Sequence, residues 1–224
     1  MKKKFLTVLI AGVILVASVS FSDSCKKDDP KVNHQSYGTP DEPVTDIDGN
    51  TYKTVKIGNQ VWMSENFKAV KTAAGQNLQG VYVYDDNNSN ANTYGRLYTW
   101  LAAVQVTPIG WHLPSKDEWD ELIRIAGGTS IAGGKLKETG TVLWNSPNTG
   151  ATNFVGFTAV GGGFRGPDGI FYDLRKHGSY WGTANNAHNP YCIYIYYNYS
   201  NLITEVSPID ITSGIAFAVR YVKN

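Results

Sequence analysis

The chain has little cysteine: Cys25 and Cys192 are the two cysteines among its 224 residues. A secreted protein with one disulfide would have to pair them, and Cys25 lies in a polar leader that makes it a poor disulfide partner. We therefore predict that Cys192, in a segment of isoleucines and tyrosines, is an unpaired, small, buried hydrophobic residue.

Charge is also scarce. Charged residues make up 17% of the chain, and the formal net charge is +1, or −1 once Lys2, Lys3, Lys4 and Asp23 leave with the N-terminal segment described below. A basic surface of the kind that binds nucleic acids is thus absent, and we expect no nucleic-acid partner. Gly (23), Tyr (14) and Trp (6) are plentiful instead, which favours a folded extracellular domain with many loops over a disordered one.

The apolar run near the N-terminus is too short for a transmembrane helix. Residues 5–19 form a run of about fifteen residues, whereas a helix needs about 20 to cross a bilayer. Three lysines precede the run and a small polar segment follows it, which is the order of a secretory signal peptide. We predict a signal peptide over residues 1–24; the alternative is a short membrane anchor that is never cut.

The residues around Cys25 predict lipidation. Residues 20–24 resemble the end of the lipobox of bacterial lipoproteins, although Ser22 stands where that motif usually has leucine. Residues 26–29, Lys-Lys-Asp-Asp, look like the export tag of Bacteroidetes surface lipoproteins. We expect acyl chains on Cys25 to insert into the membrane and to hold the protein stably at the outer membrane or cell surface.

A flexible tether is expected next, over residues 25–43. This segment is polar, contains Pro30, Pro40 and Pro43, and has almost nothing to bury. A coil of this length holds the following domain roughly 25 Å from the anchor. Residues 44–224 are sufficient for one sizeable core and are expected to form a single domain.

The domain opens with a predicted hairpin. Residues 51–57 and 60–63 are strand-like and flank a two-residue turn, Gly58–Asn59. The preceding segment Asp46–Asn50 is interpreted as a tight Asp-Gly turn. A calcium-binding EF-hand loop would need glycine at its sixth position and glutamate at its twelfth, where this chain has neither.

Two helices are predicted in the first half of the domain. Over 97–104, four apolar residues share one helical face: Leu97, Trp100, Leu101 and Val104. Over 115–126, Ser115 and Glu118 form a capping box, and Gly127 ends the helix. Its predicted buried stripe contains Trp119, Leu122, Ile123 and Ala126.

The second half of the domain shows short strands separated by glycine turns, over 154–157, 161–165, 169–172, 179–181, 191–199 and 215–222. Helices early and strands late favour the α+β class. Residues 191–197 carry apolar side chains on both of the faces that alternate along a strand, which is typical of a central strand buried on both sides. An exposed aromatic face there would instead indicate a binding surface.

Several segments, taken together, carry a family resemblance. Residues 44–63, 94–100, 110–119 and 219–223 resemble the Fibrobacter succinogenes major paralogous domain, with the landmarks in the same order. The resemblance covers nearly all of residues 44–224. It implies a secreted or lipid-anchored protein of Fibrobacter or Bacteroidetes, and it implies no particular reaction.

A more distant resemblance concerns fold. Residues 110–119, Gly-Trp-His-Leu-Pro-Ser followed by Glu118 and Trp119, are similar to a pattern of formylglycine-generating enzymes. That similarity implies a C-type-lectin-like architecture, with two helices packed on small twisted antiparallel sheets and with long loops. Where relatives often carry cysteine, this chain has Tyr82 or Tyr84 and Tyr221, so the disulfides that the resemblance implies for relatives are missing here. Formylglycine-generating enzymes hold copper with a pair of cysteines, and with Cys25 acylated this chain keeps a single thiol, Cys192.

No catalytic constellation is recognisable. The four histidines, His34, His112, His177 and His188, lack the spacing of metal ligands, and neither a serine-hydrolase elbow nor a P-loop occurs. The acidic residues at the start of the 115–126 helix are explained by capping and by the helix dipole. We therefore predict no catalytic residue, no metal and no cofactor.

The remaining candidate is a binding surface. Tyr180 and Trp181, beside Arg165 and Asp173, are proposed as a platform on which a sugar ring stacks while the polar groups bind its hydroxyls. The alternative is that these aromatic residues pack in the core. We expect the domain to bind an extracellular glycan or protein without catalysis. Two other hypotheses remain, an enzyme with carboxylates that converge in space and a structural subunit of a surface assembly.

The lipid anchor is testable by itself. Replacing Cys25 by alanine is expected to move the protein from the membrane fraction to the soluble fraction, because the acyl acceptor is lost. Cell fractionation and the mass of the mature N-terminus measure this. The prediction would be contradicted if the Cys25→Ala variant stayed in the membrane fraction and the native protein carried no acyl mass at Cys25.

Overall fold

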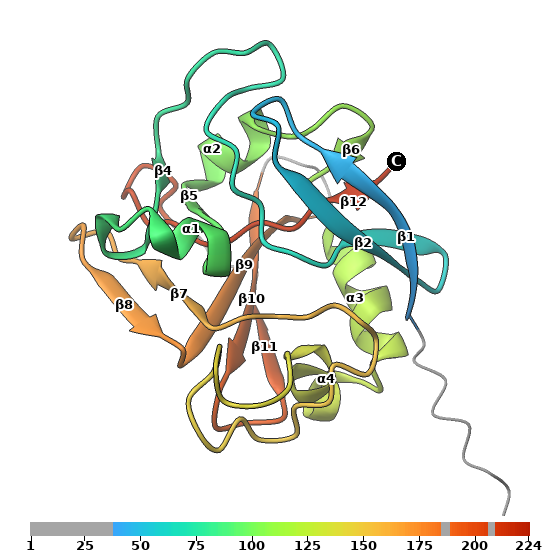
Figure 1. The fold of residues 1–224 in the computed structure, drawn as a ribbon. Coiled ribbons are helices and arrows are strands. Elements are labelled where there is room, and N and C mark those ends of the chain that lie inside the picture. Colours follow the sequence, from blue (N-terminus) through green and yellow to red (C-terminus); the bar gives the residue numbers. More distant parts are fainter. Residues whose placement is uncertain (1–37, 185–188, 206–208) are drawn as a thin grey trace, which may run out of the picture. The chain divides into compact units, whose positions relative to one another are not determined.

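The computed structural model describes residues 38–184, 189–205 and 209–224. The predicted signal peptide, Cys25 and most of the tether lie outside these residues, as does His34. Within the described ranges, no helix has the length and apolar character needed to cross a membrane. The described residues form a mixed α+β fold built from small sheets and a few short helices (Figure 1).

The first sheet joins the two ends of the described chain. It contains, in spatial order, β1 (Gly38–Thr45), β2 (Thr51–Ile57), β3 (Gln60–Met63), β12 (Val222–Lys223) and β6 (Trp111–His112). All of its pairs are antiparallel. The C-terminus therefore lies beside the sheet that the N-terminal strands form (Figure 1).

Strand β1 corrects one expectation. Residues 38–43, assigned above to the tether, lie in β1, and residues 38–41 of this range pair with β2, with Pro40 opposite Val55. Proline lacks the N–H that an inner strand needs, but β1 is the edge of its sheet, where this loss is tolerated. The register shifts between Asp41 and Val44, which is a bulge or irregularity beside Pro43. A proline-rich segment thus joins the domain as an edge strand.

The hairpin and the turn before it are confirmed. Strands β2 and β3 pair across Gly58, which has a φ of +60°. In the preceding turn, one carboxylate oxygen of Asp46 accepts the backbone N–H groups of Asp48 and Asn50, each at 2.9 Å. Gly49 adopts a φ of +82°, which a residue without Cβ does most easily.

The second sheet forms the centre of the fold. Its spatial order is β11 (Leu202–Glu205), β10 (Pro190–Tyr196), β9 (His177–Thr183), β7 (Gly162–Arg165) and β8 (Phe171–Leu174). Strand β10 is antiparallel to both of its neighbours, and Ile193 and Ile195 on it are fully buried. Cys192 is unpaired and buried, and burial raises its pKa to about 12. A separate two-stranded sheet pairs β4 (Val81–Tyr82) with β5 (Leu97–Tyr98).

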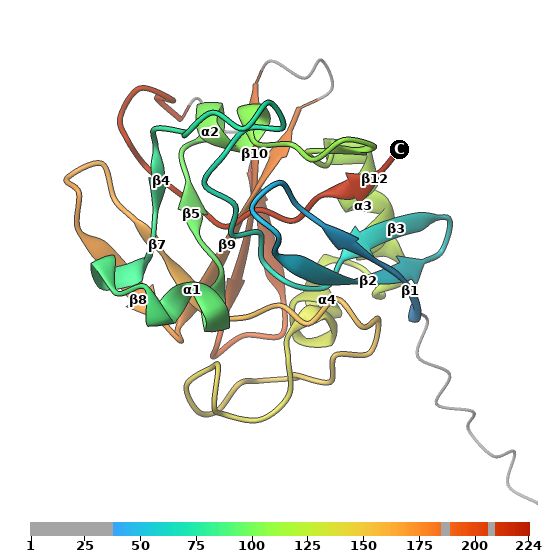
Figure 2. The same cartoon turned by 45° about the horizontal axis from the view of Figure 1, so that its top comes forward.

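The 115–126 helix is confirmed as α3 (Lys116–Ile125). Ser115 accepts the N–H of Glu118, the Glu118 carboxylate accepts the N–H of Ser115, and Trp119 and Leu122 are fully buried. It lies with α4 (Thr129–Leu136) on one side of β9 and β10 (Figure 2). The sequence did not predict α4, α1 (Ser89–Tyr94) or the short 3₁₀ turn η1 (Tyr84–Asp86).

The 97–104 helix was predicted with the wrong buried face. Leu97 lies in β5, and the helix α2 (Trp100–Gln105) begins after Thr99, whose hydroxyl accepts the N–H of Ala102. Leu101 and Val104 are 44% and 41% exposed, whereas Trp100, Ala102 and Ala103 are buried. Leu97 and Trp100 are thus buried as predicted, and Leu101 and Val104 are not. Strand pairing of residue 98 places Leu97 outside the helix, so the predicted four-residue stripe does not form.

The predicted strands at 154–157 and 215–222 also differ from the structure. Residues 154–157 form a turn, and residues 216–218 make isolated bridges to three different segments. The buried apolar residues gather in two clusters, one between the second sheet and the helices α3 and α4 and one around Tyr98, Trp181 and Phe217.

His112 connects β6, α3 and the end of the chain. Its Nε2 lies 2.7 Å from Oε1 of Glu118, and its Nδ1 lies 2.7 Å from the side-chain oxygen of Asn224. The hydroxyl of Ser115 donates to Glu118 and makes no bond to His112, so these groups do not form a serine nucleophile with a histidine base. The hydrogen bond to Glu118 raises the pKa of His112. Burial by itself would raise the pKa of Glu118, but the hydrogen bonds of its carboxylate to His112 and Ser115 outweigh burial, and the pKa of Glu118 is lowered.

These shifts predict a pH dependence. Because folding raises the pKa of His112, its contribution to stability is complete below the ordinary histidine pKa of 6.5 and is lost as the pH rises through the folded-state pKa. Because folding lowers the pKa of Glu118, its contribution is complete above the ordinary glutamate pKa of 4.5 and is lost as the pH falls through the folded-state pKa. Glu118→Gln keeps a capping-box side chain but removes the charge. It should cost under about 1 kcal/mol near pH 5.5 and less near pH 9, because the pair is partly exposed.

Denaturant unfolding at both pH values measures this, with Glu118→Ala as the comparison. The alanine variant also loses the side-chain acceptor for the N–H of Ser115, while the bond from the residue 118 N–H to Ser115 stays, and it should cost about 1 kcal/mol more than the glutamine variant at either pH. A glutamine penalty that is equal at the two pH values would show that the His112 charge does not contribute.

Candidate functional site

The predicted platform is not on the surface. Tyr180 and Trp181 are both fully buried. The Trp181 indole N–H donates to the carbonyl of Tyr98 at 2.7 Å, and the Tyr180 hydroxyl donates to the carbonyl of Val160 at 3.3 Å. Successive residues of a strand point to opposite faces, so these two neighbours on β9 cannot form one stacking surface. The alternative, core packing, is correct for both.

Arg165 and Asp173 are also engaged elsewhere. The half-buried guanidinium of Arg165 lies 4.1 Å from the centre of the Tyr82 ring and donates to the carbonyl of Gly214 at 3.1 Å. Asp173 is exposed on β8, with its carboxylate 4.0 Å from the ammonium of Lys176. The structure therefore does not bring the four predicted residues together as a binding site.

A different set of aromatic rings crosses the second sheet. We call it the aromatic strip, and it consists of Tyr172 on β8, Phe164 on β7, His177 on β9, Tyr196 on β10 and Tyr199 in the following turn. Ring centres along it are separated by 5.4 Å, 5.5 Å, 4.4 Å and 6.3 Å in that order. The strip is thus a continuous row of rings across four strands.

Strand register explains why these side chains share a face. Phe164 is the cross-strand partner of Tyr172, and Tyr196 is that of His177, and such partners project to the same side of a sheet. The next pair on this side of β10 and β11 is Tyr194 with Ile203. On the opposite side of β10, the alternating residues are buried in the core.

The two ends of the strip are open to solvent. Tyr172 is 37% exposed and Tyr199 is 55% exposed, while Phe164 and Tyr196 are half-buried. Exposed apolar groups that gather at a surface are a usual mark of a binding site, and here the exposed groups are the two end rings, which part-buried and buried rings connect. Polar groups border the strip: the Tyr172 hydroxyl donates to the carboxylate of Asp168, and Asp168 lies in the exposed turn before β8.

The centre of the strip is rigid and uncharged. His177 is 6% exposed, and its ring stacks on Tyr196 with an angle of 8° between the planes. Burial lowers the pKa of His177 to about 4, so the ring is neutral at neutral pH. Its Nε2 is shielded from solvent and has no hydrogen-bond partner in the described part of the chain. His177 therefore acts here as an aromatic ring.

Lys137 fixes the turn that carries Tyr199. Its ammonium is fully buried and donates to the carbonyls of Tyr196 and Tyr199, both at 2.9 Å. Three carbonyl oxygens lie around it in all, which matches the three N–H groups of a lysine. Burial lowers the pKa of Lys137 to about 8. One side chain thus holds the end of β10 and the exposed tyrosine in a fixed relation.

The sequence contained a signal for this surface. Tyr194 and Tyr196 alternate with Ile193 and Ile195, which predicts one aromatic and one aliphatic face. The strand was nevertheless interpreted as buried on both sides. The structure shows that its aliphatic face is fully buried, whereas on the other face Cys192 is buried and Tyr194 and Tyr196 are half-buried.

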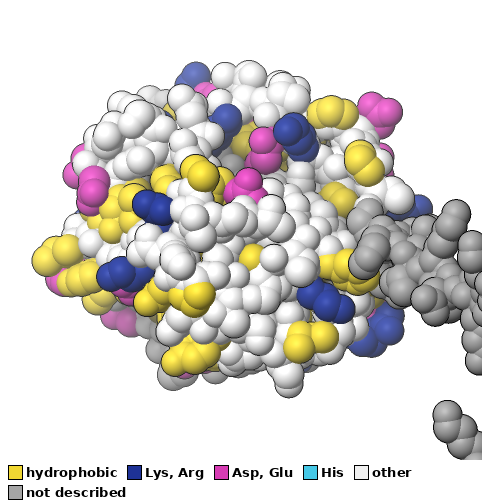
Figure 3. All heavy atoms as spheres, turned by 60° about the horizontal axis from the view of Figure 1, so that its bottom comes forward, with side chains coloured by type: hydrophobic (Ala, Val, Ile, Leu, Met, Phe, Trp, Pro, Cys, Tyr) yellow, Lys and Arg dark blue, Asp and Glu magenta, His cyan; other side chains and the backbone are white. Residues whose placement is uncertain are grey.

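The surface charge is mixed. On the face drawn in Figure 3, basic and acidic side chains of the described residues are interspersed with small groups of hydrophobic side chains, and neither sign forms a broad patch. Within the described ranges, no group of three or more His, Cys, Asp or Glu side chains is arranged to hold a metal ion.

Comparisons with known proteins place the chain in a family. The family model described as the Fibrobacter succinogenes major domain matches residues 55–223. No curated protein and no solved structure matches the chain. The match covers most of the sequence and includes nearly every described element from β2 to β12. The chain therefore belongs to the Fibrobacter succinogenes major domain family.

Proposed function

We propose that this protein is a cell-surface lipoprotein, anchored through Cys25, whose domain binds an extracellular glycan along the aromatic strip without catalysis. The observation that carries the proposal is the row of rings across four strands, open at Tyr172 and Tyr199. The anchor is supported by the leader sequence and by the charged residues after Cys25.

A glycan suits the chemistry of the strip. One face of a pyranose ring presents C–H groups, which pack on an aromatic face, while its edge presents hydroxyls. Tyrosine combines an apolar ring with a polar tip, so it contacts both parts of such a ligand. Exposed acidic and basic side chains lie at β8 and in its flanking turns: Asp168, Asp173 and Lys176. Each of them has a partner within the protein and keeps further donor or acceptor sites for ligand hydroxyls.

Preorganisation favours binding to this surface. Ordering flexible side chains on association costs free energy, and rigid rings avoid much of that cost. His177 stacked on Tyr196, and Lys137 bound to three carbonyls, hold the inner part of the strip before any ligand arrives. The free protein should therefore present the strip in its binding geometry.

A C-type-lectin-like architecture is part of the proposal. It is supported by two helices, α2 and α3, that accompany small antiparallel sheets, by long connecting loops, and by the presence of the first and last described strands, β1 and β12, in one sheet. Domains of that architecture bind ligands with surfaces near their last strands, and the strip includes β10 and the turn after it.

A second candidate function is an enzyme that acts on polysaccharide. Such an enzyme needs two carboxylates in one cleft, and Glu65 and Glu138 both line a single pocket. The aromatic strip favours binding over turnover. Release of new reducing ends from a polysaccharide by the native protein, abolished by Glu138→Gln, would decide for the enzyme.

The glycan-binding surface is tested by removing its exposed rings. Tyr172→Ala and Tyr199→Ala are each expected to weaken retention in polysaccharide affinity electrophoresis about tenfold, because each removes one stacking face. Tyr199→Phe keeps the ring and should bind like the native protein. Val142→Ala, at a residue that is 79% exposed and outside the strip, is the matched control.

Two results would contradict the proposal that the aromatic strip binds a glycan. If the native protein is retained by a polysaccharide and neither alanine variant weakens that retention, the ligand binds elsewhere. If no polysaccharide retains the native protein at all, the domain does not bind glycans.

A further inference from the structure

A polar pocket lies away from the aromatic strip. It has a volume of about 230 Å³ and is walled by residues that follow β3, by α1 and by the segments around residues 138, 158 and 220. We call it the Arg220 pocket. Pockets that enclose drug-sized ligands measure about 300–1,000 Å³, so this one suits a smaller molecule.

Arg220 forms the inner wall. It is fully buried, and its guanidinium donates to the side-chain oxygen of Asn66 at 2.9 Å and to the carbonyls of Phe157 and Thr158. These partners are neutral, and each of the three guanidinium nitrogens makes one of these bonds. Because Arg220 is fully buried, it supplies positive charge behind the pocket wall and no donor that a ligand contacts. Burial lowers the pKa of Arg220, and Glu65 and Glu138 act in the opposite direction.

Glu138 contributes an unused acceptor to the same pocket. One of its carboxylate oxygens is shielded from solvent and has no hydrogen-bond partner in the described part of the chain. Its backbone is held on both sides, since its N–H donates to Ala159 and its carbonyl accepts from Asn148. Burial raises the pKa of Glu138, as expected for a carboxylate without a donor. Glu138 as a whole is partly exposed, so a small rotation of its carboxylate brings this oxygen to a ligand hydroxyl in the pocket.

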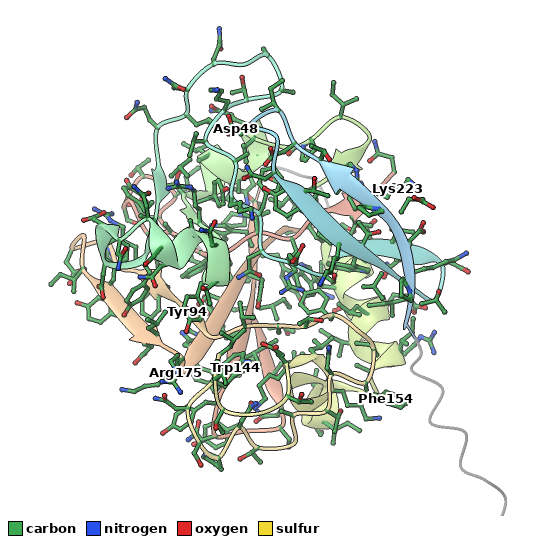
Figure 4. All side chains as sticks on the ribbon, in the orientation of Figure 1. Asp48, Tyr94, Trp144, Phe154, Arg175 and Lys223 are labelled. Atoms are coloured by element: carbon green, nitrogen blue, oxygen red, sulfur yellow. The ribbon has the colours of Figure 1, made fainter. Side chains whose placement is uncertain are left out.

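The loop that follows Glu138 is held by Arg175. Arg175, which follows β8, donates to the carbonyl of Thr141 at 2.6 Å and lies next to Trp144 (Figure 4). Tyr94 on α1 lies close to Arg175 in the same view, and its pKa is raised by burial. The pocket wall is therefore in place without a ligand.

Side chains of both charge signs line the pocket, so it favours neither a simple anion nor a simple cation. Lys53, Lys68 and Arg220 carry positive charge and Glu65 and Glu138 carry negative charge. An anion would meet the two carboxylates, and a cation would meet the three bases. A hydroxyl group both donates and accepts, so a neutral molecule with several hydroxyls matches donors and acceptors together.

We propose that the Arg220 pocket binds one neutral sugar residue, with hydroxyls that donate to Glu138 and accept from Lys53 and Lys68. The site is separate from the aromatic strip and holds whether or not the strip binds a polysaccharide. Its ligand is a free monosaccharide or the end unit of a chain.

Ligand-observed NMR on the full chain in detergent tests this, with glucose, galactose, mannose and xylose as probes and with glucuronate and glycine as charged comparisons. We expect saturation transfer to at least one neutral sugar and none to the charged pair. Glu138→Gln should weaken that sugar about tenfold, because a hydrogen bond to a charged acceptor is lost. Asn92→Trp, on the exposed rim of α1, should block binding without disturbing the core.

Matched controls separate the outcomes. Glu42→Gln, an exposed glutamate on β1, and Tyr199→Ala, in the strip, should leave monosaccharide binding unchanged. Equal unfolding curves show that the variants are folded. The proposal is overturned if no neutral sugar binds, if Glu138→Gln and Asn92→Trp leave binding unchanged, or if glucuronate or glycine binds more tightly than every neutral sugar.

Discussion

The fold depends on how one buried cation, Arg220, is held. Its guanidinium bonds to Asn66, Phe157 and Thr158, and it stacks 4.3 Å from the ring centre of Phe157 and 5.7 Å from that of Tyr180. These contacts join segments that are far apart in sequence. A charge buried without water is costly unless polar groups surround it, so the contacts must form together. The C-terminal segment is thereby fixed between the two sheets.

That segment then connects the rest of the molecule. Moving toward the C-terminus, its backbone bonds to Arg165 on β7, Tyr98 on β5, Ser179 on β9 and Phe67 after β3. It enters the first sheet as β12. Because it touches each sheet in turn, residues 215–222 form bridges where the sequence pattern predicted one strand. The aromatic strip and the Arg220 pocket both rest on strands or loops that this segment positions.

Features set by residues close in sequence could be predicted, and features set by contacts between distant residues could not. The capping box of α3 involves residues three apart, and the β2–β3 hairpin involves a two-residue turn, so both could be read from the sequence. The buried face of α2 was wrong, because strand pairing at Tyr98 sets where that helix begins. The binding platform failed for a simpler reason: Tyr180 and Trp181 are adjacent on one strand and must face opposite ways. Lys137 and Arg220 gave no signal at all, since their carbonyl partners are distant in sequence.

The two buried cations explain why a fold with so many loops can hold precise surfaces. Regular strands position side chains through repeated backbone pairing, but turns lack that repetition and need side-chain bonds to their carbonyls. Lys137 provides these bonds for the turn that carries Tyr199, and Arg220 provides them for the 157–158 turn beside the pocket. Neither cation contacts a carboxylate in the described part of the chain. Backbone carbonyls of the neighbouring turns accept hydrogen bonds from each of them and stabilise its charge. The same side chain that stabilises a turn therefore also fixes the geometry of the surface next to it.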